Sequence, residues 1–182
     1  PRCICKIRTD NADILRFDVE DTVRLLGLQR VDVAQLVQTD KTTRLIVDDF
    51  LHQGPRWEAC CALKERGLIG SLVLEVFFAC SADGVRAVEN DLFDGFIFYY
   101  NLLARELSND LFRRLEAQGT PILSLRTVGG VLDESRDPAD YRSQRQQQLV
   151  PIFEESGCGD WLEFSLRFLC SKPNVLTTIG GT

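Results

Sequence analysis

The sequence predicts an α/β fold in which parallel strands alternate with helices, and two observations carry this prediction. First, strand-like apolar runs recur along the chain, and most are separated by segments with helical spacing. Second, the separating segments carry residues that favour helix starts and stops. The expected strands are RCICKI (2–7), RVDVAQLV (30–37), LIGSLVLEV (68–76), FDGFIFYY (93–100), PILSLRT (121–127) and NVLTTIG (174–180). Such interleaving is typical of βα units and a parallel sheet.

The helical segments have capping residues near their expected starts. Asp18 is placed to cap the first helix, and Pro55 suits the first turn of the second. Ser81 and Ser108 are placed to cap two more. The expected helices are 18–28, 55–67, 81–92, 108–119 and 159–173. The polar stretch 133–148 breaks this alternation, and we interpret it as a surface excursion.

Composition narrows the class of protein. Asp and Glu number 27 against 21 Lys and Arg, and the basic residues are scattered, so we expect no nucleic-acid partner. No apolar run approaches the roughly 20 residues of a membrane span, so we expect no membrane insertion. Seven cysteines in strand-like or helix-like patterns indicate reduced thiols and a cytoplasmic location. Because Cys3 and Cys5 lack further ligands, and His52 lies elsewhere, we expect no metal site.

Two parallel-sheet folds compete, an open doubly wound sheet and a closed barrel. A dinucleotide-binding doubly wound sheet carries a glycine-rich loop after its first strand. The corresponding segment here, KIRTDNAD (6–13), contains no glycine. The barrel is therefore the better prediction.

Four runs together carry a family resemblance. They are VEDTVRLLGLQRVDVAQL (19–36), ALKERGLIGSLVL (62–74), FDGFIFYYNLLARELSNDLFRRLEAQGTPILSLRTVGG (93–130) and LRFLCSKPNVLTTIGGT (166–182). In order and spacing they resemble the aldo/keto reductase family. The resemblance implies an α/β fold of the (β/α)8 TIM-barrel type and NADP(H)-dependent reduction of aldehydes and ketones. It aligns residues 1–182 with the third to eighth strands, as a single barrel segment without the first two βα units and the last helix. We therefore expect a larger chain, or a partner segment or chain, to complete the barrel.

The resemblance also assigns catalytic positions. Lys6 matches the family lysine, whose charge would lower the pKa of a catalytic tyrosine, although a solvent-facing lysine is equally expected at this strand end. Val37 falls where the family has a histidine, and valine can neither donate nor relay a proton. The catalytic aspartate and tyrosine of the family would lie upstream of Pro1.

The cofactor positions also depart from the family pattern. Glu75 and Val76 replace the Ser-Asn pair that holds the nicotinamide amide, and Ile97 replaces a glutamine that grips the same amide. The ring-stacking position falls on Leu125 or Arg126. Arg126 can stack, bind a phosphate, or pair with a carboxylate. By resemblance, the backbone-lined phosphate loops correspond to Gly129, Gly130, Gly181 and Thr182.

Two functions follow. The first is a degenerate aldo/keto reductase-like domain that is not catalytic, binds NADP(H) weakly or not at all, and serves as a binding or scaffolding domain. The alternative is an active NADP(H)-dependent oxidoreductase that reduces a small carbonyl substrate, an aldehyde, ketone or sugar, with aspartate and tyrosine supplied by an upstream segment. We favour the first, because several positions have lost hydrogen-bonding capacity together.

Overall fold

The computed structural model describes residues 3–36, 42–132 and 136–179. The chain divides into two compact units. Unit 1 comprises Pro1–Ile97 and Leu107–Thr120, and unit 2 comprises Phe98–Glu106 and Pro121–Thr182.

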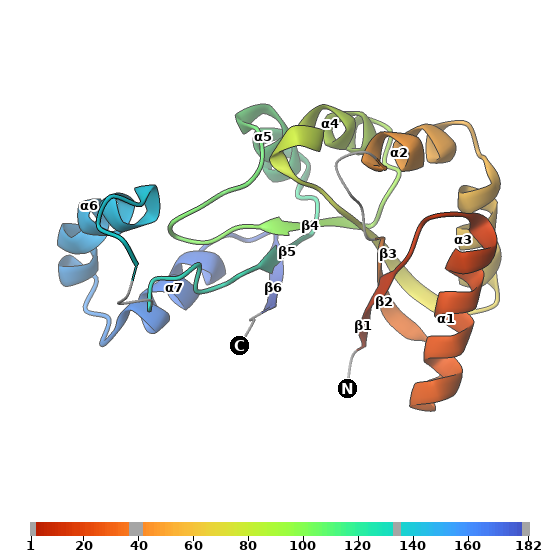
Figure 1. Cartoon of the computed structure of the whole chain (residues 1–182), viewed down its shortest axis with the longest axis horizontal. Coiled ribbons are helices and arrows are strands. Elements are labelled where there is room, and N and C mark those ends of the chain that lie inside the picture. Colours follow the sequence, from red (N-terminus) through yellow and green to blue (C-terminus); the bar gives the residue numbers. More distant parts are fainter. Residues whose placement is uncertain (1–2, 37–41, 133–135, 180–182) are drawn as a thin grey trace. The chain divides into compact units, whose positions relative to one another are not determined.

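The described strands run parallel and follow one another in the order in which they occur along the chain (Figure 1). They are β1 (Ile4–Ile7), β2 (Val31–Leu36), β3 (Ile69–Glu75), β4 (Gly95–Tyr99), β5 (Ile122–Leu125) and β6 (Val175–Ile179). All six lie within the predicted strand segments, so the predicted alternation is confirmed. This sequential order of parallel strands is the pattern of a (β/α) barrel rather than of a doubly wound sheet.

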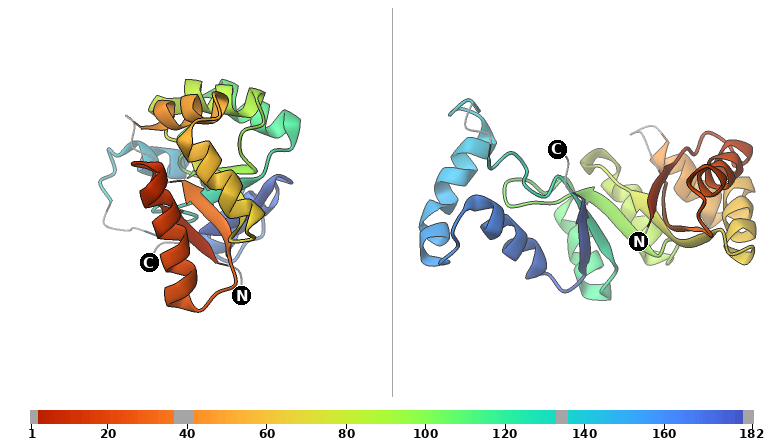
Figure 2. Two further views of the ribbon diagram at one scale, coloured as in Figure 1. Left: turned by 90° about the vertical axis from the view of Figure 1, so that its right-hand side faces the viewer. Right: turned by 90° about the horizontal axis from the view of Figure 1, so that it is seen from below.

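Unit 1 contains β1 to β3, the first part of β4, the helices between these strands and the helix that follows β4. The helices are α1 (Ala12–Leu26), α2 (Thr43–Leu51), α3 (Pro55–Glu65), α4 (Ser81–Glu89) and α5 (Asn109–Gln118), with a 3-10 turn η1 (Phe78–Cys80) before α4. Helix α1 packs beside α3, as both views in Figure 2 show, and α4 packs beside α5. Helix α2 was not predicted from the sequence.

The first helix begins earlier than predicted. Asn11 caps α1 by accepting a hydrogen bond from the Ile14 N–H, at 2.9 Å. Asp18 lies inside the helix and binds the guanidinium of Arg8. Gly27 ends the helix in the left-handed conformation, with φ of 60°.

Of the two predicted serine caps, Ser108 is confirmed and Ser81 is wrong. Ser108 caps α5 as predicted, because its Oγ accepts the Leu111 N–H. Ser81 does not cap α4, because it is the first residue of the helix itself. The Ser81 Oγ instead accepts the Ser108 N–H at 2.9 Å, which ties the start of α4 to the start of α5.

Unit 2 contains the end of β4, then β5, α6 (Tyr141–Glu155), α7 (Trp161–Cys170) and β6. Its core combines Leu102, Leu103 and Val131 with aromatic rings of α7, and Phe153 of α6 stacks on Trp161. Helix α6 was not predicted, since part of it lies in the polar stretch 133–148. None of its residues is buried, so it lacks the apolar stripe that makes a helix visible in a sequence.

No helix in the described ranges has the length and apolar character needed to cross a membrane.

Candidate functional site

The pairing register of unit 1 places Lys6 of β1, Gln35 of β2 and Glu75 of β3 on one face. Lys6 pairs with Gln35, and Gln35 pairs with Val73. Paired residues in a parallel sheet point to the same face, and Glu75 follows Val73 by two residues, so it shares that face. Lys6 is exposed there, near the carboxyl end of β1.

A buried hydrogen bond joins β2 to β3 on this face. The Gln35 Nε2 donates to the Glu75 Oε2 at 2.9 Å. Gln35 is 1% exposed and Glu75 is 4% exposed. A buried carboxylate is costly unless it is hydrogen-bonded, and here the amide of Gln35 supplies the donor. One oxygen of the Glu75 carboxylate, Oε2, is therefore already bonded within the protein.

The other two positions that match the nicotinamide-amide site are apolar packing. Val76 and Ile97 are fully buried. Their main chains pair, because the Val76 N–H donates to the Ile97 carbonyl oxygen at 3.0 Å. Neither side chain has a donor or acceptor to offer an amide.

Three of the family-matched positions lie outside the described residues. They are Val37, Gly181 and Thr182.

Unit 2 contains a cavity of about 310 Å³ at the loops that follow β4 and β5. Its lining combines a polar set from both loops with the start of α6: Tyr99, Asn101, Ala104, Glu106, Arg126, Thr127, Val128, Gly129, Gly130, Tyr141 and Arg142. Three residues that the sequence singled out, namely Arg126, Gly129 and Gly130, therefore line one cavity. Glu75 and Lys6 belong to unit 1.

Arg126 presents an exposed guanidinium at this cavity. The guanidinium carbon lies 4.3 Å from the centroid of the Tyr99 ring, which is a cation–π contact. The Arg126 backbone has a φ of 53°, an unusual conformation for a residue other than glycine. Within the described residues no ion pair joins Arg126 to a carboxylate, and Glu106 is the acidic residue that lines the same cavity.

The buried amide of Asn101 holds the two loops of the cavity together. Its Oδ1 accepts the N–H groups of Leu103 and Ala104, each at 2.9 Å. Its Nδ2 donates to the Arg126 carbonyl oxygen at 3.0 Å. A Cβ at Gly129 would lie 2.3 Å from the Asn101 Oδ1, so this close approach requires glycine. Sequence reasoning missed Asn101, because its partners are recognisable only once the loops are folded.

An ion pair fixes the start of α6 at the rim of the cavity. Asp140 caps the helix by accepting the Arg142 N–H at 2.8 Å. The Arg142 guanidinium also donates Nε and Nη2 to the two carboxylate oxygens of Asp140, at 3.1 and 2.9 Å. These hydrogen bonds lower the pKa of Asp140 to about 2. Arg142 is thus partly neutralised, whereas Arg126 is not.

The cysteines form neither a disulfide nor a metal-binding group in the described parts of the chain. All seven are free thiols. Burial raises the pKa of the Cys60 thiol to about 12, which makes it a poor nucleophile. Across residues 3–36, 42–132 and 136–179, no three His, Cys, Asp or Glu side chains are grouped so as to hold a metal ion.

Known proteins match this chain in a comparison of structures, but not in comparisons of sequence. No family model matches the sequence. No curated protein matches it either.

Solved structures of aldo-keto reductases do match. A thermostable aldo-keto reductase solved with the inhibitor epalrestat superposes with a TM-score of 0.70 at 16% identity, over 98% of this chain and 60% of that chain. An aldo/keto reductase from Klebsiella pneumoniae, solved with NADP and acetate, gives a TM-score of 0.68 at 16% identity, over 98% and 59%. One from Pseudomonas aeruginosa gives 0.55 at 19% identity, over 94% and 53%.

The likeness is one of fold. At these identities it carries no activity, cofactor or substrate to this chain. The chain spans about 60% of the length of the first of these structures. It therefore has the aldo-keto reductase fold, in the form of part of the (β/α)8 barrel.

Proposed function

We propose that this chain is part of an aldo-keto reductase-like barrel that does not transfer hydride and serves as a binding or scaffolding domain. The observation that carries the proposal is the buried hydrogen bond between Gln35 and Glu75. The family position that would receive the nicotinamide amide holds a carboxylate that is already bonded inside the protein. Its neighbours Val76 and Ile97 are buried and apolar.

Binding of NADPH should be weak as a consequence. Val76 and Ile97 leave two hydrogen bonds of the nicotinamide amide unmade, each worth about 0.5–1.5 kcal/mol, which weakens binding by roughly ten-fold or more. Burying the nicotinamide amide without hydrogen-bond partners makes the free energy of NADPH binding still less favourable.

Unit 2 supplies the place where we propose that a ligand binds. The open guanidinium of Arg126 and the turn at Gly129 and Gly130 face one cavity, and both features suit an anionic group such as a phosphate. Family resemblance suggests the phosphates of NADP(H), while the cavity volume also suits a smaller phosphate ester.

The alternative function is an active NADP(H)-dependent oxidoreductase that reduces a carbonyl. Two observations favour it. Lys6 is exposed at the strand position that matches the family lysine. Two solved structures of aldo-keto reductase from Klebsiella pneumoniae, which have the same fold, contain NADP or NADPH. This function requires an aspartate and a tyrosine from a segment outside the sequence given.

A paired experiment separates the two functions. The longest natural form of the protein is titrated with NADPH by fluorescence and assayed for NADPH oxidation with a panel of aldehydes and ketones. We expect NADPH affinity weaker than micromolar and no turnover. Micromolar or tighter affinity together with turnover would overturn the proposal and establish the oxidoreductase.

We further propose that another segment or chain completes the barrel beside β1 and β6. These strands stand at the two ends of the strand order, so each pairs on one side only among the described strands. Unpaired strand edges favour pairing with further strands. Hydrogen exchange on these 182 residues alone tests this: residues 4–7 and 175–179 should exchange rapidly. Strong protection in a monomer would contradict it.

We also propose a cytoplasmic location, because a reducing compartment suits seven free thiols.

A further inference from the structure

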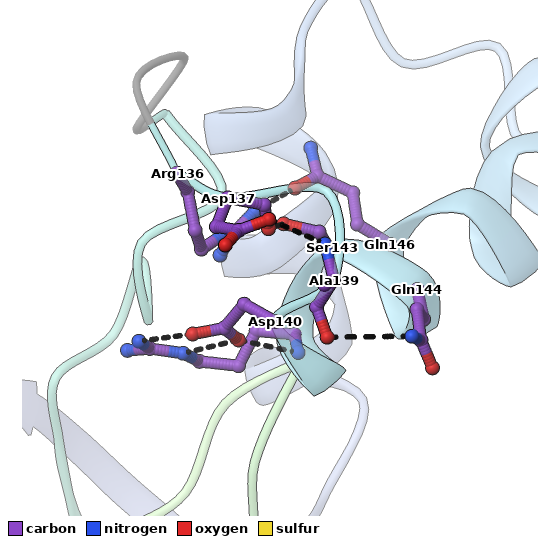
Figure 3. A network of polar contacts seen from close by, with 8 residues as sticks. Arg136, Asp137, Ala139, Asp140, Ser143, Gln144 and Gln146 are labelled. Carbon is purple, nitrogen blue, oxygen red and sulfur yellow. Dashed lines mark hydrogen bonds and ion pairs between the residues drawn. The ribbon is translucent and has the colours of Figure 1, made fainter.

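The polar stretch before α6 contains an arginine that the family resemblance does not assign. The Arg136 Nε donates to the Ser143 Oγ at 3.0 Å, and its Nη2 donates to the Gln146 Oε1 (Figure 3). Ser143 in turn donates to the Asp137 carbonyl oxygen at 2.9 Å. The guanidinium is therefore clamped to the first two turns of α6.

The third nitrogen of this guanidinium is unusual. Among the described residues, the Arg136 Nη1 is buried and has no hydrogen-bond partner. Native proteins rarely leave a buried donor unpaired, because its desolvation is then uncompensated. Both acceptors of the other two nitrogens are neutral side chains, so the positive charge of Arg136 is not neutralised by them.

The unpaired nitrogen lies directly behind the turn that lines the cavity of unit 2. A Cβ built at Gly130 would lie 3.3 Å from the Arg136 Nη1, so the side chain supports the backbone of the turn. Gly130 has a φ of 85° and Gly129 a φ of 59°, and both line the cavity. The turn thus lies between the cavity lining and the half-buried guanidinium of Arg136.

We propose that Arg136 is a positioning residue for anion binding in this cavity and gives it a preference for dianions over monoanions. Arg136 is not among the residues that line the cavity, so it acts through the turn, by fixing the Gly129–Gly130 backbone and by adding the field of its positive charge. Arg126 faces the anion from the exposed side. The ligand class is a phosphate monoester, whose two charges interact with both guanidinium groups. This inference rests on the proposed anion site of unit 2.

The test is calorimetric titration of the protein with inorganic phosphate at pH 8 and, separately, with acetate. Arg136→Gln should weaken phosphate binding by about ten-fold and acetate binding by roughly two-fold, because the field of the lost charge acts on two charges of phosphate and on one of acetate. Arg136→Lys keeps the charge without the fork geometry, so it should retain the preference for phosphate over acetate. The control is Arg113→Gln on α5, an exposed arginine of unit 1 that bonds its own helix backbone, which should change neither affinity.

Three results would overturn the inference. They are an equal loss of phosphate and acetate affinity in Arg136→Gln, no loss in that variant, and absence of phosphate binding in the unmodified protein. These three results concern anion binding only. Whether the protein transfers hydride is decided separately, by the NADPH turnover assay. Failure of the inference and failure of the proposed function are therefore distinguishable.

Discussion

The two units differ in whether their functional polar side chains have partners within the protein. In unit 1, the buried carboxylate of Glu75 is satisfied by Gln35, a partner from the same protein. In unit 2, Arg126 has no carboxylate partner within the described residues, and the Arg136 Nη1 has no partner there at all. A polar group that is satisfied internally contributes to packing, whereas the exposed guanidinium of Arg126 lines a cavity and is accessible to a ligand there. This contrast supports our proposal that the Gln35–Glu75 pair of unit 1 is structural and that a ligand binds in unit 2.

The largest expected effect comes from breaking the pair in unit 1. Gln35→Leu leaves the Glu75 carboxylate buried without its donor, so the free energy of unfolding should fall by about 3 kcal/mol. Phosphate binding in unit 2 should be unchanged. Urea denaturation measures the first quantity and calorimetry the second.

The double variant Gln35→Leu/Glu75→Leu is the control for that prediction. Replacing both partners with apolar groups should recover most of the lost stability. If the double variant is no more stable than the single one, the loss in Gln35→Leu does not come from leaving the Glu75 carboxylate without its hydrogen-bond donor.

Gly129→Ala should have the next largest effect. The new Cβ would meet the Asn101 amide at 2.3 Å in a backbone with φ of 59°, and we expect a loss of about 2 kcal/mol with loss of anion binding. Gly27→Ala is a matched control, since its φ of 60° is nearly identical and its Cβ would meet no atom within 4 Å. That variant should lose only about 1 kcal/mol and bind phosphate normally. Equal losses in stability would show that the Asn101 contact is unimportant.

The fold could be predicted further from the sequence than the site could. Strand periodicity and helix caps are local signals, and they located all six strands and the start of α5 at Ser108. Helix α6 was missed because it has no buried face and contains Pro151, so no periodicity identifies it. The start of the first helix was predicted at Asp18 rather than at Asn11, because both residue types are good N-caps. Only the folded structure shows that the Asp18 carboxylate binds Arg8 instead.

The site depends on contacts between distant segments, and the sequence shows these poorly. Glu75 was identified by its family position, yet its partner Gln35 lies 40 residues earlier. An isolated glutamine in an apolar strand was the available signal for that partner. Asn101 and Arg136 carried no such signal, because loop geometry alone brings them to Gly129 and Gly130.

The smallest expected effect is the pH dependence of the cap of α6. The pKa of Asp140 is about 2 in the folded state, below the value of about 3.9 in the unfolded state. The ionised carboxylate therefore stabilises the fold at pH values above about 4. The contribution is lost as the pH falls from about 4 to about 2. It should be modest because the ion pair is exposed. Thermal unfolding of Asp140→Asn beside the parent protein, from pH 6 to pH 2, isolates it: the two stabilities should converge at low pH. A constant difference across that range would contradict the assignment.

The most direct test of the account compares NADPH with its nicotinamide-free analogue, 2′-phospho-ADP-ribose, in calorimetric titrations of the same protein. If Glu75 is engaged by Gln35 and Val76 and Ile97 are packing, the nicotinamide contributes no binding energy. The two ligands should then have dissociation constants within about three-fold of each other, less than the value of one net hydrogen bond. NADPH affinity greater than that of the analogue by about ten-fold or more would show that the amide site is open, and would contradict the account.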